Sequence, residues 1–200
     1  MVVHNHRMRR LLILVAIACL AGGSLLTAGP SASEVLIETE LGAIRVRLDP
    51  DHAPRTVANF LRYVDEHFFD GTSFYRTVRA DNQPTSPVKI AVIQGGPDEK
   101  KPEHEAIALE RTSVTGLHHV DGTVSMARDG PDTATAEFFI CVGAQPALDF
   151  GGTRNPDGQG FAAFGQVVDG MDVVRKINEA AANGQRLSPP IAITRIVRAN

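Results

Sequence analysis

The sequence predicts a mainly β protein whose strands form a closed or partly closed antiparallel barrel. Three observations carry this prediction: short runs of β-branched and aromatic residues recur along the chain, two segments show helical periodicity, and strands and helices do not alternate. Regular alternation would favour a parallel sheet, whereas many short strands in succession favour a sandwich or a barrel. The 200 residues, 43% hydrophobic and 22% charged, suit one folded domain behind a short leader.

The first 33 residues have the order of a secretory signal peptide. Arginines within residues 7–10 are followed by an apolar run over residues 11–21 and then by small residues that end at Ser33. We therefore expect residues 1–33 to be removed and residues 34–200 to form a single exported domain. A bacterial periplasm suits such a leader best.

Two alternatives would leave the leader attached to a membrane. Apolar and small residues continue to Ala28, which would suit an uncleaved anchor, but Gly22 and Gly23 interrupt the run well short of the usual span. Cys19 loosely resembles the cysteine of a lipoprotein cleavage site, although the chain after it stays apolar where a polar tether is usual. We keep both as minor alternatives.

Charge and cysteine content limit the partners of the exported domain. The net charge of −3 becomes more negative once the basic leader is removed, and no cluster of Lys and Arg follows, so nucleic acid is not an expected partner. Cys141 is then the one remaining cysteine, so no internal disulfide forms. Its apolar neighbours favour a small buried hydrophobe over a nucleophile.

We expect the exported domain to be a monomer.

The domain opens with a predicted hairpin and a helix. Residues 35–39 and 43–48 are strand-like, and a tight turn at Leu41 and Gly42 joins them. Residues 55–67 then carry apolar side chains three and four positions apart, which predicts an amphipathic helix with Pro54 at its start.

The remaining elements follow as short runs separated by long connections. Further strands are predicted at residues 73–78, 89–94, 123–127, 137–142, 162–168 and 191–197, and a second helix at 171–182. Long connections over residues 95–107, 112–122 and 150–160 are of the kind that is usually functional or mobile.

Familiar catalytic devices are missing from the sequence. It contains no Gly-x-Ser-x-Gly elbow and no His-Glu-x-x-His motif, and its acidic residues are scattered. His118 and His119 are adjacent, so in an extended segment they would point to opposite faces, and a shared metal ion is not expected. The glycines within residues 151–160 match no nucleotide fingerprint.

A single arginine, Arg76, lies in an otherwise apolar predicted strand. In a regular strand Phe74, Arg76 and Val78 would share one face, and Tyr75 and Thr77 the other. Taken alone, this segment suits a surface arginine in a salt bridge.

Read together, the segments resemble the cyclophilin family of peptidyl-prolyl isomerases over essentially all of residues 34–200. No single motif is decisive, but their order is highly specific. The matching motifs are Ala-Pro-Arg-Thr-Val-Ala-Asn-Phe at 53–60, Phe-Tyr-Arg at 74–76, Val-Ile-Gln-Gly-Gly at 92–96, Gly-Thr-Val-Ser-Met-Ala at 122–127, Gly-Pro at 130–131, Glu-Phe-Phe-Ile-Cys at 137–141, Leu-Asp at 148–149 and Phe-Gly-Gln-Val-Val-Asp-Gly-Met at 164–171.

The resemblance implies a fold, an activity and a site. The implied fold is a closed eight-stranded antiparallel barrel capped by two α-helices, and the implied activity is rotation of X-Pro bonds in proline-containing polypeptides during folding, with no cofactor or metal. Arg76 resembles the catalytic arginine of the family, and Gln94 the glutamine that positions it. Substrate-binding positions by the same resemblance are Val92, Phe139 and Leu148 in the walls of the proline pocket, and Ala127 and Arg128 at a strand edge that pairs with the substrate backbone.

Such a sparse site suits the chemistry. Rotation about an X-Pro amide breaks no covalent bond, and the obstacle is a barrier of about 18–20 kcal/mol from partial double-bond character. A guanidinium that donates to the prolyl carbonyl stabilises the twisted amide more than the planar one. Arginine suits this role because its planar fork stays charged and fixed in direction.

Four positions depart from the family pattern. Ala91 stands where a pocket phenylalanine is expected, after an unusually long segment over residues 77–92. Glu137 replaces a common glutamine, and its carboxylate could orient Arg76 or compete with the substrate carbonyl. Ala147 replaces a tryptophan that helps to bind cyclosporin, so weak cyclosporin binding is expected. Phe161 takes the place of a rim histidine after the inserted residues 150–160.

These departures leave two functional classes open. The retained Arg76, Gln94 and Phe139 favour an active isomerase that assists the folding of exported proteins. Ala91, Glu137 and the inserted segments leave room for a proline-peptide binding module or chaperone on the same fold, with little or no turnover. We favour the isomerase.

Overall fold

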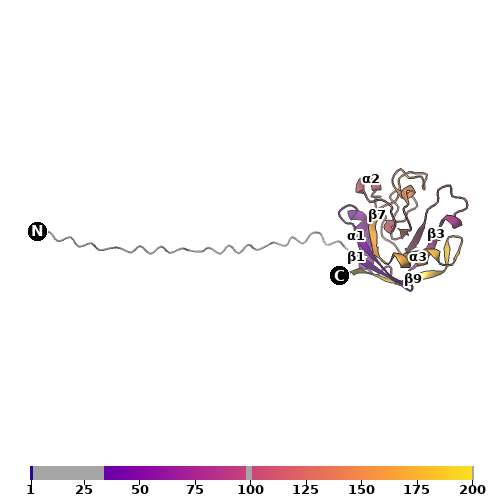
Figure 1. Cartoon of the computed structure of the whole chain (residues 1–200), viewed down its shortest axis with the longest axis horizontal. Coiled ribbons are helices and arrows are strands. Elements are labelled where there is room, and N and C mark those ends of the chain that lie inside the picture. Colours follow the sequence, from indigo (N-terminus) through magenta and orange to yellow (C-terminus); the bar gives the residue numbers. More distant parts are fainter. Residues whose placement is uncertain (2–33, 98–100, 200) are drawn as a thin grey trace. The chain divides into compact units, whose positions relative to one another are not determined.

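The computed structural model describes Met1 and residues 34–97 and 101–199. The helices and strands of the described residues lie in one compact unit, Ala32–Asn200 (Figure 1). The expected signal peptide over residues 1–33, and Cys19 within it, lie outside the described residues. No helix in the described part of the chain has the length and apolar character needed to cross a membrane.

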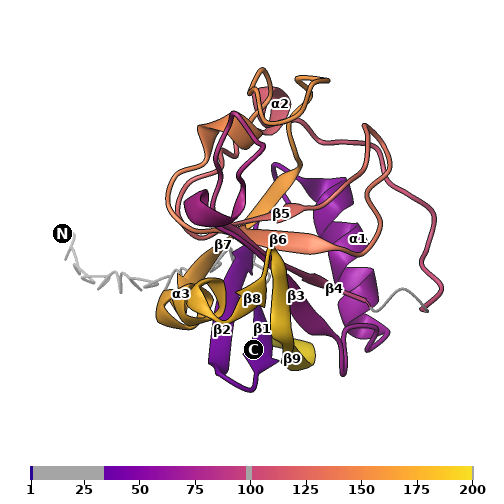
Figure 2. The same cartoon turned by 90° about the vertical axis from the view of Figure 1, so that its right-hand side faces the viewer.

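Eight antiparallel strands form a closed barrel, as predicted (Figure 2). Their order is β1–β2–β7–β5–β6–β4–β3–β9, and pairing of β1 with β9 closes the ring. The short arm β8 (Ala182–Asn183) pairs with the start of β9. The barrel strands are β1 (Glu34–Thr39), β2 (Gly42–Leu48), β3 (Ser73–Val78), β4 (Val92–Gly96), β5 (Thr123–Met126), β6 (Phe138–Cys141), β7 (Ala163–Asp169) and β9 (Arg186–Ala199).

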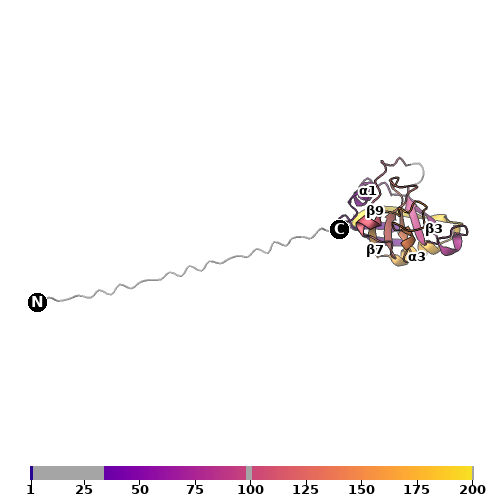
Figure 3. The same cartoon turned by 90° about the horizontal axis from the view of Figure 1, so that it is seen from above.

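The two predicted helices cover opposite sides of the barrel (Figures 2 and 3). Helix α1 (Pro54–Asp65) begins at a proline, and Glu110 accepts hydrogen bonds from the backbone N–H groups of its first turn at 2.8 and 3.2 Å. Helix α3 is Met171–Glu179. The connections contain three single turns that the sequence analysis did not predict, namely η1 (Ala80–Asn82), α2 (Thr112–Thr115) and η2 (Pro146–Leu148).

Aromatic side chains fill the inside of the barrel. Phe60 from α1 lies 5.3 Å from Phe69, 5.5 Å from Phe138 and 5.1 Å from Phe164, measured between ring centroids. All four are at most 1% exposed. The interior is therefore a packed core, and a binding site must lie on the outer surface.

A second, smaller apolar cluster lies apart from this core. Its buried members are Val78, Ile90, Val92, Phe139, Cys141 and Leu148, with Ala127 and Phe161 packed against them. Phe138 and Phe139 show the division, because successive side chains of β6 point to opposite faces of the barrel wall. Cys141 is buried as predicted, and burial raises the pKa of its thiol well above the usual value.

Strand β3 is not regular, which corrects the expected alternation. Its register with β4 runs from Phe74 opposite Gly95 to Arg76 opposite Gln94, so Tyr75 forms a bulge. Phe74 joins the barrel core, whereas Tyr75 and Arg76 both reach the side chain of Gln94. The bulge thus places two consecutive polar side chains on the same side of the sheet.

Candidate active site

A cavity of about 520 Å³ lies over the second apolar cluster. It brings together every residue that the sequence analysis assigned to the site, with the exception of Ala91. The lining residues are Arg76, Ile90, Val92, Gln94, Glu103, Ala127, Arg128, Asp129, Thr133, Thr135, Glu137, Phe139, Leu148, Arg154, Asn155 and Phe161.

Two glutamines hold the guanidinium of Arg76. Its Nη1 donates to Oε1 of Gln94 at 2.8 Å, while Nε and Nη2 donate to Oε1 of Gln185 at 3.0 and 2.6 Å. A guanidinium has five N–H donors, so one N–H on each terminal nitrogen is left for a substrate. The guanidinium of Arg76 is therefore fixed in direction, but two of its N–H groups have no hydrogen-bond acceptor among the described residues.

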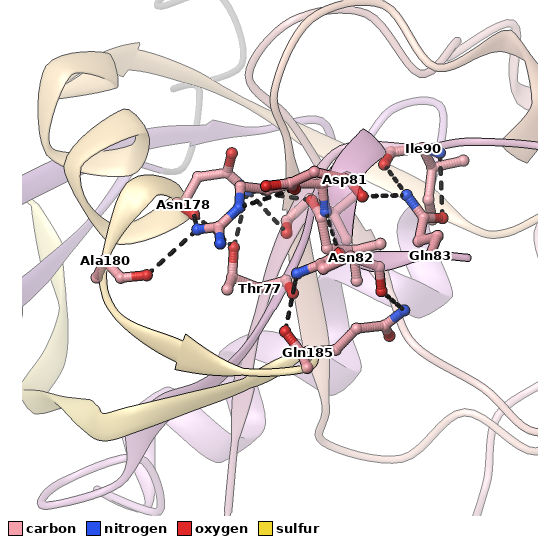
Figure 4. A network of polar contacts seen from close by, with 12 residues as sticks. Thr77, Asp81, Asn82, Gln83, Ile90, Asn178, Ala180 and Gln185 are labelled. Carbon is pink, nitrogen blue, oxygen red and sulfur yellow. Dashed lines mark hydrogen bonds and ion pairs between the residues drawn. The ribbon is translucent and has the colours of Figure 1, made fainter.

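Gln185 was not predicted, because it lies 109 residues from Arg76 in the sequence. It stands in the turn between β8 and β9, and its backbone carbonyl accepts from Thr77 at 2.9 Å. Its Nε2 also donates to the carbonyl of Asn82 at 3.3 Å (Figure 4). Hydrogen bonds to two other segments thus keep this turn beside β3.

Glu137 acts on Arg76 through Gln94. Its carboxylate accepts from the hydroxyl of Tyr75 at 2.7 Å and from Nε2 of Gln94 at 3.0 Å. Gln94 also donates from Nε2 to the Tyr75 oxygen at 2.7 Å, so its Oε1 is left to face Arg76. Within the described residues no ion pair joins Glu137 to Arg76. Glu137 therefore neither orients Arg76 by direct contact nor competes with the substrate carbonyl for it, but acts through the side chain of Gln94.

The same network changes the acidity of Tyr75. Burial, followed by the hydrogen bond to Glu137 and its charge, raises the pKa of the Tyr75 hydroxyl well above its usual value. Tyr75 therefore stays a neutral donor to Glu137 at physiological pH, and no general acid or base is needed for rotation about an amide.

Apolar side chains form the floor of the cavity. Phe139 is 4% exposed, and the ring of Phe161 meets it edge-on at 5.4 Å with an interplanar angle of 90°. Ala91, which precedes β4, does not line the cavity, and its carbonyl accepts from the backbone N–H of Val142 at 2.9 Å. This corrects its predicted place in the pocket, whereas its neighbour Ile90 does line the cavity.

Behind Phe139, a hydrogen-bonded chain joins the buried Ser125 and His119 to the partly exposed Asp149. His119 Nδ1 contacts Asp149 Oδ1 at 2.6 Å, and its Nε2 contacts Ser125 Oγ at 3.0 Å. This order is that of a hydrolase triad, yet Ser125 and the His119 side chain are both 0% exposed, so no substrate reaches the hydroxyl. The ring of His119 instead stacks on Phe139 at 5.9 Å and 15°.

The two adjacent histidines do not point apart as expected, because both contact Asp149. His118 Nδ1 lies 3.0 Å from Asp149 Oδ2. Burial lowers the pKa of His119, although its bond to Asp149 opposes this. Burial also acts to raise the pKa of Asp149, but its hydrogen bonds from His119 and His118 prevail and hold it below the usual value. No cluster of potential metal ligands occurs among the described residues.

Arg128 holds the rim on the side of the inserted residues 150–160. Its guanidinium forms a bidentate pair with Asp157 at 2.8 and 2.9 Å, donates to the carbonyl of Gly160 at 2.8 Å and lies 4.9 Å from the centroid of Phe161. The backbone N–H of Ala127 donates to the carbonyl of Glu137 at 2.9 Å, which continues the pairing of β5 with β6. The side chain of Arg128 thus holds the inserted residues 150–160 against the rim of the cavity.

Two kinds of site residue escaped the sequence analysis. Tyr75 was next to Arg76 but was assigned to the other face, and a β-bulge leaves no signal in the alternation of residues. Arg154 and Gln185 lie in loops without a motif, and tertiary contacts alone bring Arg154 to the cavity and Gln185 to the guanidinium of Arg76.

A closed eight-stranded barrel, an outer cavity with an apolar floor and a fixed arginine together define the cyclophilin class of protein. The comparisons agree: residues 34–198 match the family described as cyclophilin type peptidyl-prolyl cis-trans isomerase/CLD. The chain belongs to this family and is a peptidyl-prolyl cis-trans isomerase.

Curated relatives and a solved structure carry the same name. A peptidyl-prolyl cis-trans isomerase of Acinetobacter baylyi is 36% identical over 82% of this chain and 82% of its own. Peptidyl-prolyl cis-trans isomerase B of Escherichia coli is 37% identical over 74% of this chain and 85% of its own. A cyclophilin type isomerase of Cryptosporidium parvum shares the fold with a TM-score of 0.69 at 22% identity, covering 84% of this chain and 98% of that chain.

Proposed function

We propose that Arg76 catalyses rotation about X-Pro bonds by donating to the prolyl carbonyl as the amide twists. The observation that carries this proposal is a guanidinium held by Gln94 and Gln185, with N–H groups left over, in a cavity with an apolar floor. A donor that needs no reorganisation stabilises the twisted amide more than the planar one, which lowers the barrier.

The cavity suits a proline ring and the extended chain around it. Phe139, Val92 and Leu148 supply apolar contact for the ring, and Ala127 and Arg128 lie beside it as the proposed edge for the substrate backbone. One solved relative with this fold was crystallised in the presence of the dipeptide Ala-Pro, which supports a proline-containing peptide as the ligand here. Weak cyclosporin binding and a monomeric state remain our expectations.

The test compares Arg76→Ala and Arg76→Lys with the wild type in a protease-coupled or exchange-NMR assay on an X-Pro peptide. We expect kcat/KM to fall by about two to three decades for alanine, and nearly as far for lysine, which lacks the fork. Arg47→Ala, on the exposed face of β2, is the matched control. If Arg76→Ala kept wild-type turnover, the mechanism would be wrong; if wild type and variant bound peptide without turnover, the chain would be a binding module.

We also propose that residues 1–33 are a cleaved signal peptide and that the domain assists folding of proteins exported to a periplasm. The support is the basic, apolar and small-residue order of the leader. N-terminal sequencing of protein from a periplasmic fraction should find a start at or close to Glu34. Recovery of the intact leader from the membrane fraction would favour an anchor instead.

A further inference from the structure

The two segments that depart from the family pattern, residues 77–92 and 150–160, meet at Arg154. Its Nη1 donates to Gln83 Oε1 at 2.9 Å, Ser86 Oγ at 2.6 Å and the carbonyl of Val88 at 2.6 Å. Its backbone N–H donates to the carbonyl of Ala147 at 3.1 Å. Both ends of this residue are therefore anchored, and its guanidinium is held at the cavity wall.

The support under Arg154 is itself buried and satisfied. Gln83 is 2% exposed, and its Nε2 donates to the carbonyls of Arg79 and Ile90, both at 2.7 Å (Figure 4). Its Oε1 accepts from the backbone of Ile90 as well as from Arg154. A buried amide with its donors and acceptor in use keeps one orientation, so the guanidinium above it is pre-positioned.

Arg154 presents positive charge to the cavity. Among the described residues, no ion pair involves Arg154, and the hydrogen bonds that hold it use Nη1 alone, which leaves Nε and Nη2 for a ligand. Burial, and then the charge of Arg76, lowers the pKa of Arg154. Arg76 and Arg154 line the same cavity, and two cations in one cavity are a natural site for an anionic group.

The cavity has an acidic end and a basic end. Glu137 lies where β6 meets the Gly96 end of β4, whereas Arg154 lies by Ile90, before β4 begins. Ile90 and Gln94 are four residues apart in an extended segment, which is roughly 13 Å. A peptide that spans the cavity therefore passes from one sign of charge to the other.

The proposed chemistry orients that peptide. If Arg76 donates to the prolyl carbonyl, the next residue of the substrate is attached to the carbon of that same carbonyl. The residues before proline are assigned to the strand edge at Ala127, so the residues after proline leave on the other side of the pocket. Arg154 lines the cavity there, and its backbone N–H donates to the carbonyl of Ala147, next to Leu148 of the proline pocket, at 3.1 Å. The residues before proline lie along the backbone edge at Ala127, whose N–H donates to the carbonyl of Glu137 at the acidic end.

We propose that Arg154 forms an anionic subsite that selects substrates with Glu or Asp one or two positions after proline. This inference rests on the proposed function, because it takes the direction of the peptide from the role of Arg76. Its consequence is that two unrelated loops give this isomerase a charge preference that its barrel strands do not supply.

The experiment measures affinity and turnover for matched peptides. Ala-Ala-Pro-Glu and Ala-Ala-Pro-Gln peptides differ only in charge after proline, and Ala-Glu-Pro-Ala and Ala-Gln-Pro-Ala differ before it. NMR titration gives affinity without requiring turnover, and exchange NMR gives kcat/KM. The proteins are the wild type, Arg154→Gln, and Arg62→Gln as a control on the exposed face of α1.

We expect the wild type and Arg62→Gln to bind the Pro-Glu peptide about fivefold to tenfold more tightly than Pro-Gln, and Arg154→Gln to bind the two equally. The preference should shrink as NaCl is raised, because salt screens half-exposed charge. Equal affinities in the wild type, a preference that survives in Arg154→Gln, or a preference for Glu before proline would each overturn the proposal. A preference in affinity without turnover would instead reject the proposed function and leave the subsite standing.

Discussion

The two ends of the cavity are built by different kinds of structure. At one end, strand pairing sets Arg76 opposite Gln94 and Gln94 opposite Phe139. At the other, Arg154 and Gln83 join two loops through side-chain hydrogen bonds. The barrel strands therefore supply the groups that act on the X-Pro amide. The loops supply the groups that we propose to bind the substrate residues after proline.

The strand-built end should respond most strongly to a small change. In Gln94→Ala, Arg76 loses one of its two anchors and Glu137 loses a donor, so we expect kcat/KM to fall about tenfold to hundredfold through misplacement of the guanidinium. Exchange NMR on a neutral X-Pro peptide measures this. A fall of less than twofold would show that Gln185 alone positions Arg76.

The free energy of unfolding of the protein should depend on pH through His119, which packs behind Phe139. Its pKa is lowered in the folded protein, so below about pH 6.5 the unfolded chain binds the proton more readily and folding is disfavoured. We expect a loss of at most about 2 kcal/mol from this histidine between pH 7 and pH 5 in urea unfolding. The free energy of unfolding of His119→Gln should be lower at pH 7 but should change less between pH 7 and pH 5. If it changed as much as in the wild type, the pH dependence would arise from other groups.

The hairpin turn between β8 and β9 should matter less than the strands. Gln185→Ala removes two hydrogen bonds to Arg76 but leaves the bond to Gln94, so we expect kcat/KM to fall about threefold to tenfold. Comparison with Gln94→Ala in one assay tests the order. A larger loss in Gln185→Ala would reverse the ranking of strand and loop.

The smallest effect on basal turnover is expected from Gln83→Ala. This change removes the support of Arg154 without touching Arg76, so turnover of a neutral peptide should stay within about twofold, while the carbonyls left unpaired cost about 1–3 kcal/mol locally. Hydrogen exchange should become faster over residues 79–90, and the preference for Glu after proline should be lost. If Gln83→Ala lost turnover of the neutral peptide, catalysis by Arg76 would depend on the loops that hold Arg154.

Local sequence patterns predicted the barrel well. Alternating apolar residues in the first hairpin appear as β1 and β2 with Val35, Ile37, Ile44 and Val46 buried, and the three-and-four spacing before His67 appears as α1. These patterns succeed because burying one face of an element requires a fixed period in the sequence. The same regularity explains why the bulge at Tyr75 was missed.

By itself, the sequence determined the strands, the two long helices and the family. Nine of the residues that it proposed for the site, Arg76 first among them, line the cavity. The tertiary structure alone decided what surrounds that arginine. Gln185 meets Arg76, and Arg154 meets Gln83, through hydrogen bonds between segments far apart in the chain, and such contacts depend on how the loops pack on the barrel. A period along the chain carries no information about them.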